Sequence, residues 1–197
     1  MELQIPTLEQ LRTVYAADLV EAFPAAELKP LRAIEQLWED GFYRPWCLFD
    51  GGKIVGECFL WLGEPGWALL DYLCVSPRCR NGGTGAVLLE KMREANGDLV
   101  ILGECEIPAY APEPAMAERR LGFYDRNCAR LAGYDTAMFG VPYKTIYWSD
   151  APLPDDELMA HHRWIYQNRF SPANYTKYVR IPWDPAQPQL PRVPWDE

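Results

Sequence analysis

The sequence predicts one α+β domain with a mostly antiparallel sheet, followed by a C-terminal extension. Three observations support this prediction. The 197 residues, of which 49% are apolar, suffice for one well-buried core but not for two full domains. Helical and strand-like segments follow in the order helix, helix, three strands, helix, strand, helix, two strands. A buried strand that leads through a helix to another buried strand indicates one parallel crossover.

The N-terminal part reads as two helices joined by a loop. Apolar residues recur at steps of three or four over 7–23, and Thr7 is a residue type that caps helices. Pro24 and Pro30 bracket the loop. A second helix is expected to follow and to end near Gly41.

Strand patterns begin after this point. Segments 46–49 and 54–62 flank the turn Asp50-Gly51-Gly52-Lys53, which is typical of a hairpin. Segment 67–75 is almost entirely apolar, as expected of a central strand buried on both faces. The remaining predicted elements are a helix over 83–95, a strand over 99–107, a helix over 115–132, and strands over 134–139 and 143–148.

These elements place the main domain at residues 1–150 and the extension at 151–197. The extension begins with a helix over about 155–168. A tail rich in proline and tryptophan follows, with Pro182, Trp183, Pro185, Pro188, Pro191, Pro194 and Trp195. Such a tail cannot form a central strand, so we expect it to be extended and to wrap over a surface.

Charge and cysteine content exclude several classes of protein. The chain has 19 Lys and Arg against 28 Asp and Glu, a net charge of -9, which disfavours nucleic acid and anionic membranes as partners. No membrane-spanning run and no signal-peptide pattern is recognised. The six cysteines lack the spacing of a disulfide scaffold, which indicates reduced thiols and a cytoplasmic location.

The stretch 69–85 carries the main chemical signal. A buried strand leads into a turn that contains Arg80, Asn81 and three glycines, and the turn leads directly into a helix. Glycines allow a ligand to approach the backbone, and the free N–H groups of a helical first turn bind phosphate. A tight turn without any ligand is the alternative explanation for the glycines.

The spacing within this turn favours a ligand. Arg80-x-x-Gly83-x-Gly85 resembles the acyl-CoA signature of the GNAT superfamily of acetyltransferases. Segments 104–108, 119–127 and 139–143 look like the fifth strand, fourth helix and closing hairpin of one bacterial subgroup. Together the resemblance covers roughly residues 8–150.

The resemblance implies a sheet whose fourth and fifth strands splay apart, with the pantetheine arm of acetyl-CoA between them. It implies transfer of an acetyl group from acetyl-CoA to an amine by direct attack in a ternary complex. Carried over to this sequence, the cofactor-binding residues are Leu73, Cys74, Val75, Arg80, Asn81, Gly82, Gly83, Thr84 and Gly85.

Such a reaction needs a base near the amine and a weak acid near the sulfur. The resemblance makes Tyr124 the acid and Glu104 the base, with Asp71 as a third carboxylate that assists the base or binds the substrate. Alternation along a strand puts Glu104 and Glu106 on the same face, where the two carboxylates would repel each other. The alternative for Tyr124 is a tyrosine that only packs in the core. The alternative for the carboxylates is that they are solvated and take no part in catalysis.

For the acceptor pocket, the sequence offers two candidate residues. Glu27 in the N-terminal loop and Glu106 are candidates for binding a cationic substrate, either a small-molecule amine or a peptide amine. The family usually shows a glycine after Tyr124, and here Asn127 is expected to adopt the positive φ that this glycine would provide. The adjacent His161 and His162 fit no metal site or hydrolase triad. A homodimer is left open.

Two rival functions are kept. The chain could be a non-catalytic acyl-CoA-binding sensor or interaction module on the same fold, with carboxylates that are not poised for catalysis. It could also be a structural interaction protein without coenzyme A, which the Trp- and Pro-rich tail would suit. Turnover on an amine panel and a rise in melting temperature with coenzyme A separate the three.

Overall fold

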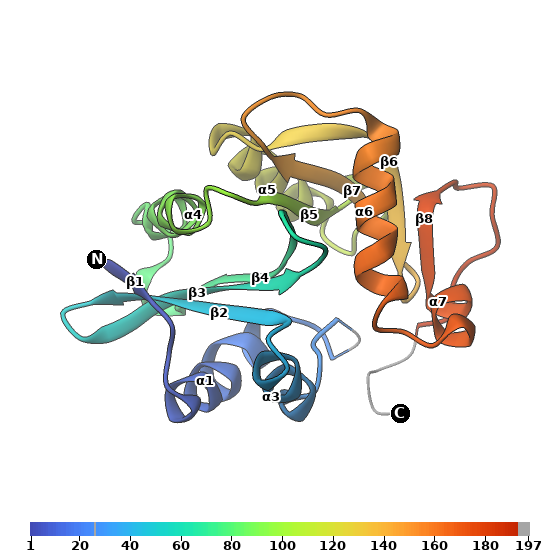
Figure 1. The fold of residues 1–197 in the computed structure, drawn as a ribbon. Coiled ribbons are helices and arrows are strands. Elements are labelled where there is room, and N and C mark those ends of the chain that lie inside the picture. Colours follow the sequence, from blue (N-terminus) through green and yellow to red (C-terminus); the bar gives the residue numbers. More distant parts are fainter. Residues whose placement is uncertain (26, 193–197) are drawn as a thin grey trace. The chain divides into compact units, whose positions relative to one another are not determined.

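The computed structural model describes residues 1–25 and 27–192, which form two compact units. The first unit comprises Met1–Leu62 and Leu70–Asp98, and the second comprises Gly63–Leu69 and the chain from Leu99 on. Each unit combines helices with strands, and the strand pairs that the structure defines within each are antiparallel (Figure 1). The predicted α+β class is therefore confirmed.

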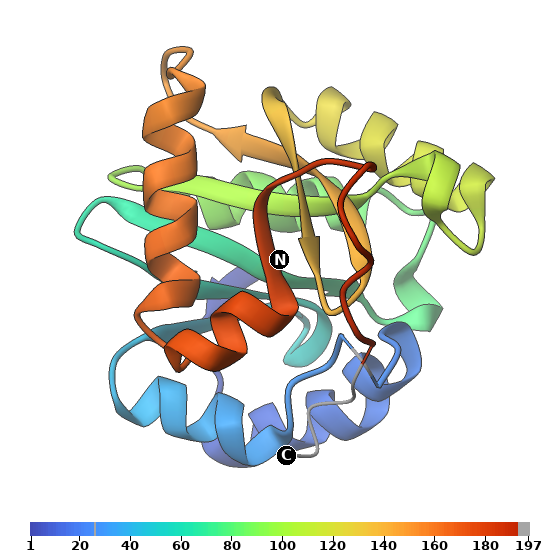
Figure 2. The same cartoon turned by 90° about the vertical axis from the view of Figure 1, so that its right-hand side faces the viewer.

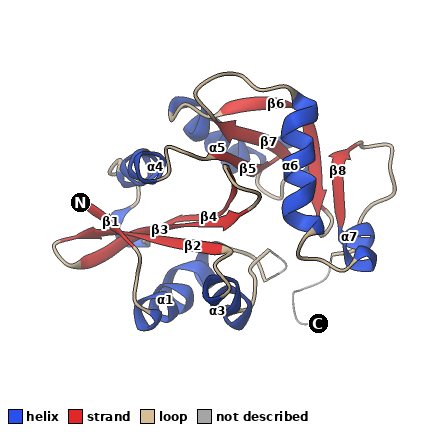
Figure 3. Ribbon diagram, in the orientation of Figure 1, coloured by secondary structure: helices blue, strands red, loops and turns tan. Residues whose placement is uncertain are grey.

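The first unit contains the N-terminal helices, strands β1 to β3, strand β4 from Leu70 on, and the helix that follows β4. Figure 3 shows helices α1 and α3 on one face of strands β2 and β3 and helix α4 on the other. The elements are β1 (Glu2–Gln4), α1 (Leu8–Val14), a π-helical turn (Tyr15–Leu19), α2 (Val20–Ala22), α3 (Leu31–Glu39), β2 (Tyr43–Asp50), β3 (Lys53–Leu62), β4 (Trp67–Val75), a 3₁₀ turn (Pro77–Cys79) and α4 (Thr84–Ala95).

Local sequence explains where the first elements begin. Thr7 and Gln10 form a capping box, in which the Gln10 N–H donates to Thr7 Oγ1 at 3.2 Å and the Thr7 N–H donates to Gln10 Oε1 at 2.8 Å. At the β2–β3 turn, Gly51 and Gly52 have φ of +55° and +78°, as a tight hairpin requires. The predicted single helix over 7–23 is interrupted by the π-helical turn, in which Asp18 is buried.

The second unit is a four-stranded sheet in the order β5-β7-β6-β8, with three helices. Figure 2 shows the chain passing from α6 through α7 into β8, which lies beside β6. The elements are β5 (Val100–Glu106), a 3₁₀ turn (Pro108–Tyr110), α5 (Pro114–Arg126), β6 (Arg130–Met138), β7 (Val141–Trp148), α6 (Asp155–Gln167), α7 (Pro172–Tyr178) and β8 (Val179–Trp183).

Helices α5 and α6 contact opposite faces of this sheet. Thr145, which lies opposite Glu104 in the β5–β7 register, shares the face of β5 that meets α6. Trp148, three residues further along β7, points to the other face and donates from Nε1 to the Asn127 carbonyl at the end of α5. Glu104 and Trp148 therefore meet different helices.

The C-terminal extension is structured differently from its prediction in one respect. Pro182 and Trp183 belong to β8, which occupies the edge of the sheet, the place in a sheet where proline is tolerated. Pro185, Pro188 and Pro191 follow outside any strand or helix. Pro194 and Trp195 lie outside the described residues.

Candidate functional site

Two side chains stabilise the turn after β4 by bonding to its backbone. Arg80 Nε donates to the carbonyl of Val75 at 3.0 Å, and Thr84 Oγ1 donates to the carbonyl of Cys79 at 3.1 Å. Asn81 and Gly83 adopt positive φ of 65° and 81°. These bonds turn the chain from the end of the strand directly into α4.

The N-terminus of α4 presents backbone to solvent at this turn. Gly83 occupies the N-cap position, where no side chain caps the helix, and Asn81, Gly82 and Gly83 are exposed. A Cβ atom built on Gly83 would meet no atom within 4 Å. No side chain caps the first N–H groups of this 12-residue helix, and an uncapped helix N-terminus is an arrangement that binds anionic phosphate.

The end of β4 contributes the other predicted cofactor residues. Leu73 and Val75 are half-buried and alternate with Cys74, which is buried. Burial, followed by the charge of Glu57, raises the pKa of the Cys74 thiol to about 12, so the thiol keeps its proton. The pairing of this backbone with pantetheine, and the splay of the fourth and fifth strands, stay predictions.

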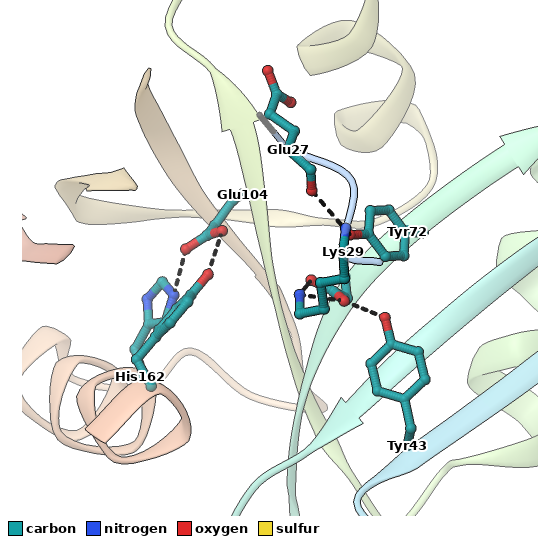
Figure 4. A network of polar contacts seen from close by, with 8 residues as sticks. Glu27, Lys29, Tyr43, Tyr72, Glu104 and His162 are labelled. Carbon is teal, nitrogen blue, oxygen red and sulfur yellow. Dashed lines mark hydrogen bonds and ion pairs between the residues drawn. The ribbon is translucent and has the colours of Figure 1, made fainter. Parts of the chain in front are cut away.

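Asp71 of β4 forms an ion pair inside the first unit. Lys29 Nζ lies 2.7 Å from each Asp71 carboxylate oxygen, and their side chains are only 6% and 10% exposed (Figure 4). Tyr43 also donates to Asp71, and the ammonium lies 4.5 Å from the ring centroid of Trp61. Removing one partner of such a pair leaves a buried charge, so any change at Asp71 affects stability as well as catalysis.

Glu27 belongs to the same network through its backbone. Tyr72 Oη donates to the Glu27 carbonyl at 2.9 Å and accepts from the Lys29 N–H at 2.8 Å (Figure 4). The loop that carries Glu27 is therefore fixed to β4, while its side chain is half-buried. Its predicted contact with a cationic substrate stays a prediction.

Glu104 of β5 is held by the C-terminal helix α6. His162 Nε2 lies 2.9 Å from Glu104 Oε1, and Tyr166 Oη donates to Glu104 Oε2 at 2.9 Å (Figure 4). His162 is completely buried, and its Nδ1 lies 3.2 Å from the hydroxyl of Tyr134 in β6. Sequence reasoning missed both partners, although the spacing of four between His162 and Tyr166 places them on one face of a helix.

The neighbouring carboxylate, Glu106, has a different partner. It forms an ion pair with Arg120 of α5. Although alternation puts Glu104 and Glu106 on the same face of the strand, each is neutralised or hydrogen-bonded separately. Each carboxylate therefore has a partner of its own, and the repulsion between them stays a prediction.

Tyr124 of α5 lies beside Cys105 and Trp148, in the same unit as Glu104. Its ring meets those of Trp148 and Phe123 edge-on, with centroids 5.8 and 5.3 Å away. Burial, with the charge of Cys105 as a further cause, raises the pKa of the phenol above its ordinary value. The hydroxyl stays protonated at neutral pH, as a proton donor must.

The end of α5 differs from the expectation at Asn127. The residue with positive φ is Cys128 (65°), whereas Asn127 has φ of -104°. The N–H of Ala129 donates to Tyr124 and that of Cys128 to Asp125, the two bonds of a Schellman cap. Asn127 stays on the right-handed side because its Nδ2 donates to the Phe123 carbonyl at 2.7 Å.

Comparison with known proteins decides the family. The model of the acetyltransferase (GNAT) family matches residues 8–123, more than half of the chain. This protein belongs to the GNAT family. Acetyltransferases of this family use acetyl-CoA, in agreement with the cofactor predicted from the turn at Arg80–Gly85.

Solved structures with the GNAT fold resemble this chain at low sequence identity. A putative acetyltransferase from the GNAT family of Bacteroides thetaiotaomicron is 22% identical, with a TM-score of 0.68, covering 83% of this chain and 95% of that one. The ribosomal-protein-S18-alanine N-acetyltransferase of Escherichia coli is 14% identical (TM-score 0.58; 79% and 97% covered). Spermidine N-acetyltransferase of Vibrio cholerae, in complex with CoA and spermine, is 12% identical (0.55; 75% and 94%). These likenesses show the GNAT fold alone. A sequence search of curated proteins returns no match.

No cluster of three or more His, Cys, Asp or Glu among residues 1–25 and 27–192 could hold a metal ion. In the same part of the chain, no helix has the length and apolar content needed to cross a bilayer.

Proposed function

We propose that this protein is an N-acetyltransferase that transfers the acetyl group of acetyl-CoA to an amine by direct attack in a ternary complex. Family membership supports acetyl transfer in general. The observation that favours the direct route is the presence, within one unit, of an oriented carboxylate at Glu104 and a protonated phenol at Tyr124. These are the base and the acid that the reaction requires.

The residues of the turn after β4 suit the coenzyme. The open space at Gly83 and the uncapped N-terminus of α4 would receive the diphosphate, and Arg80 adds positive charge beside it. Leu73, Cys74 and Val75 would provide backbone groups for the pantetheine amides. When bound, acetyl-CoA supplies a thioester whose acyl carbon is open to a neutral amine and whose thiol can leave.

The chain's own residues would move two protons. Glu104 would accept the proton that the amine nitrogen loses as the nitrogen–carbon bond forms. Tyr124 would donate its proton to the sulfur as the carbon–sulfur bond breaks, and would then recover a proton from solvent. Asp71 forms an ion pair with Lys29. We therefore assign Asp71 a structural role on the acceptor side of the site.

The acceptor class follows from charge. The net charge of -9, with Glu27 and Glu106 as candidate contacts, favours a cationic amine. Both a polyamine and a protein N-terminus or lysine satisfy this requirement. One structural relative is a spermidine N-acetyltransferase and another is a ribosomal-protein-S18-alanine N-acetyltransferase, so both classes belong in an acceptor panel.

A non-catalytic acyl-CoA-binding module is the second candidate. The observation in its favour is that the three acidic side chains Glu104, Glu106 and Asp71 all have protein partners. In such a module these contacts would hold the fold together and no amine would be deprotonated.

Thiol release from acetyl-CoA, measured over a panel of polyamines, amino acids and peptides, separates the two candidates. Turnover with at least one amine, together with a loss of roughly 10²-fold or more in kcat for Glu104→Gln, is the expected result. Glu106→Gln is the matched control and should change only the KM of the acceptor. Coenzyme A binding in calorimetry without turnover on any amine would favour the binding module.

A further inference from the structure

The contact between Glu104 and α6 links the candidate base to a part of the chain beyond the matched family region. The family match ends at residue 123, whereas α6 spans Asp155–Gln167. His162 is 0% exposed, and both of its ring nitrogens have partners within 3.2 Å. A buried histidine with two partners has one orientation fixed by the structure.

The chemistry of the groups determines the direction of these bonds. An ionised carboxylate only accepts hydrogen bonds, so His162 must donate from Nε2 to Glu104 in both its neutral and its charged form. Burial raises the pKa of Tyr134, which therefore keeps its proton and can donate to Nδ1 of neutral His162. In this neutral tautomer both ring nitrogens of His162 have a matching partner.

We propose that His162 is a positioning residue for Glu104 and that the C-terminal helix completes the catalytic machinery. His162 orients the carboxylate through one oxygen, and Tyr166 does the same through the second oxygen. This inference rests on the proposed role of Glu104 as base. It extends that role by assigning residues of the extension to the reaction.

Other groups facing Glu104 belong to three strands and do not replace these donors. Thr145 of β7 lies directly opposite and is completely buried, and Tyr134 of β6 contacts the histidine. Glu106, the nearest carboxylate along β5, is paired with Arg120. Removing the His162 donor therefore acts on Glu104 without freeing a second charge.

The test compares two substitutions at this position. His162→Met removes the Nε2 donor, while His162→Gln keeps an N–H donor at the equivalent distance from the backbone. With His162→Met, kcat should fall roughly tenfold or more, and the acid limb of the kcat/KM profile should move up by about one pH unit. The limb moves upward because a carboxylate that loses a donor is protonated more easily. His162→Gln should restore most of the activity and the position of the limb.

Control variants separate positioning from simple packing. His161→Met alters the neighbouring histidine, which contacts Glu64 and stacks on Trp67, and should leave the acid limb in place. Tyr166→Phe should move the limb in the same direction as His162→Met. If His162→Met lowers the melting temperature and kcat but leaves the limb unmoved, the residue is structural and the proposal fails.

A measurement that does not depend on turnover separates failure of this inference from failure of the proposed function. Nitrogen-15 NMR of the imidazole in the full-length protein should show a protonated Nε2 in His162, which a Glu104→Gln substitution perturbs. An unprotonated Nε2 would overturn the inference even if the enzyme is active. If the signal is as expected but no amine is acetylated, the contact stands and positioning for catalysis is refuted together with the proposed function.

Discussion

Glu57 on β3 is a buried acid that takes no part in the proposed reaction. It is 0% exposed, and neither carboxylate oxygen has a conventional hydrogen-bond partner among the described residues. Burial, followed by the charge of Asp18, raises its pKa to about 8, although Cys74 and Arg80 oppose the shift. At neutral pH the folded protein therefore holds a proton on Glu57 that the unfolded chain releases.

This proton makes stability depend on pH. Between the ordinary value of 4.5 and about 8, the folded state binds more protons than the unfolded state, so stability falls as the pH rises through this window. The loss is on the order of 4 kcal/mol, at about 1.4 kcal/mol per pKa unit. We expect Glu57→Gln to lack this slope, which urea unfolding at pH 5 and pH 8 would measure. An equal difference between variant and wild type at both pH values would contradict it.

Tyr124 can be tested with little risk to the fold. Phenylalanine keeps the ring contacts with Trp148 and Phe123 and removes only the hydroxyl. We expect Tyr124→Phe to lower kcat by roughly 10²-fold, because the sulfur loses its proton donor. Coenzyme A affinity, measured by calorimetry, should not change. A variant with wild-type turnover would remove Tyr124 from the mechanism.

At this scale the sequence located candidate groups but not their partners. Glu104 and Tyr124 were found because they lie inside motifs. Their surroundings depend on contacts between distant parts of the chain: Glu104 and His162 are 58 positions apart, and Lys29 and Asp71 are 42 apart. No local pattern encodes such pairs, so the hydrogen-bond partners of these two carboxylates cannot be predicted from the sequence.

Among the elements, the turn into α4 yields the most direct test of the cofactor site. Gly83→Ala would place a methyl group in the open space before the helix, at a φ of +81° that strains any L-residue. We expect coenzyme A affinity to fall at least tenfold in calorimetry. Gly52→Ala is the matched control, since Gly52 has φ of +78° and nothing within 4 Å of its Cβ position. It should lower stability to a similar extent and leave affinity unchanged; an equal loss of affinity would refute the site.

The long elements are predictable because their periodicity is strong and because residues that form caps or turns mark their ends. The helix expected over 83–95 is α4 (Thr84–Ala95), and the strand expected over 67–75 is β4. The helix expected to reach residue 132 ends at Arg126, because Cys128 closes it without a glycine. The three-residue β1 and the edge strand β8 depend on pairing with distant strands, so periodicity alone does not identify them.

For the whole molecule, the predicted boundary at residue 150 remains a proposal. Within the second unit, the segment beyond it buries Leu158, Ile165, Tyr166, Val179 and Ile181. We expect a chain that ends at Asp150 to lose cooperative unfolding, because the apolar surface that it exposes has nothing else to cover it. Circular dichroism during heating would show this. A truncated chain with the melting temperature of the full protein would establish 1–150 as an independent domain.

The π-helical turn at Tyr15–Leu19 has a consequence for how this chain tolerates length changes. Such a turn accommodates one residue more than a regular helix does. Deleting one residue there would convert it to regular α-helix without turning the helix on either side of it. Leu11 and Val14, which precede the turn, would stay in the core. The same deletion within α1 would instead rotate the residues before it by about 100°.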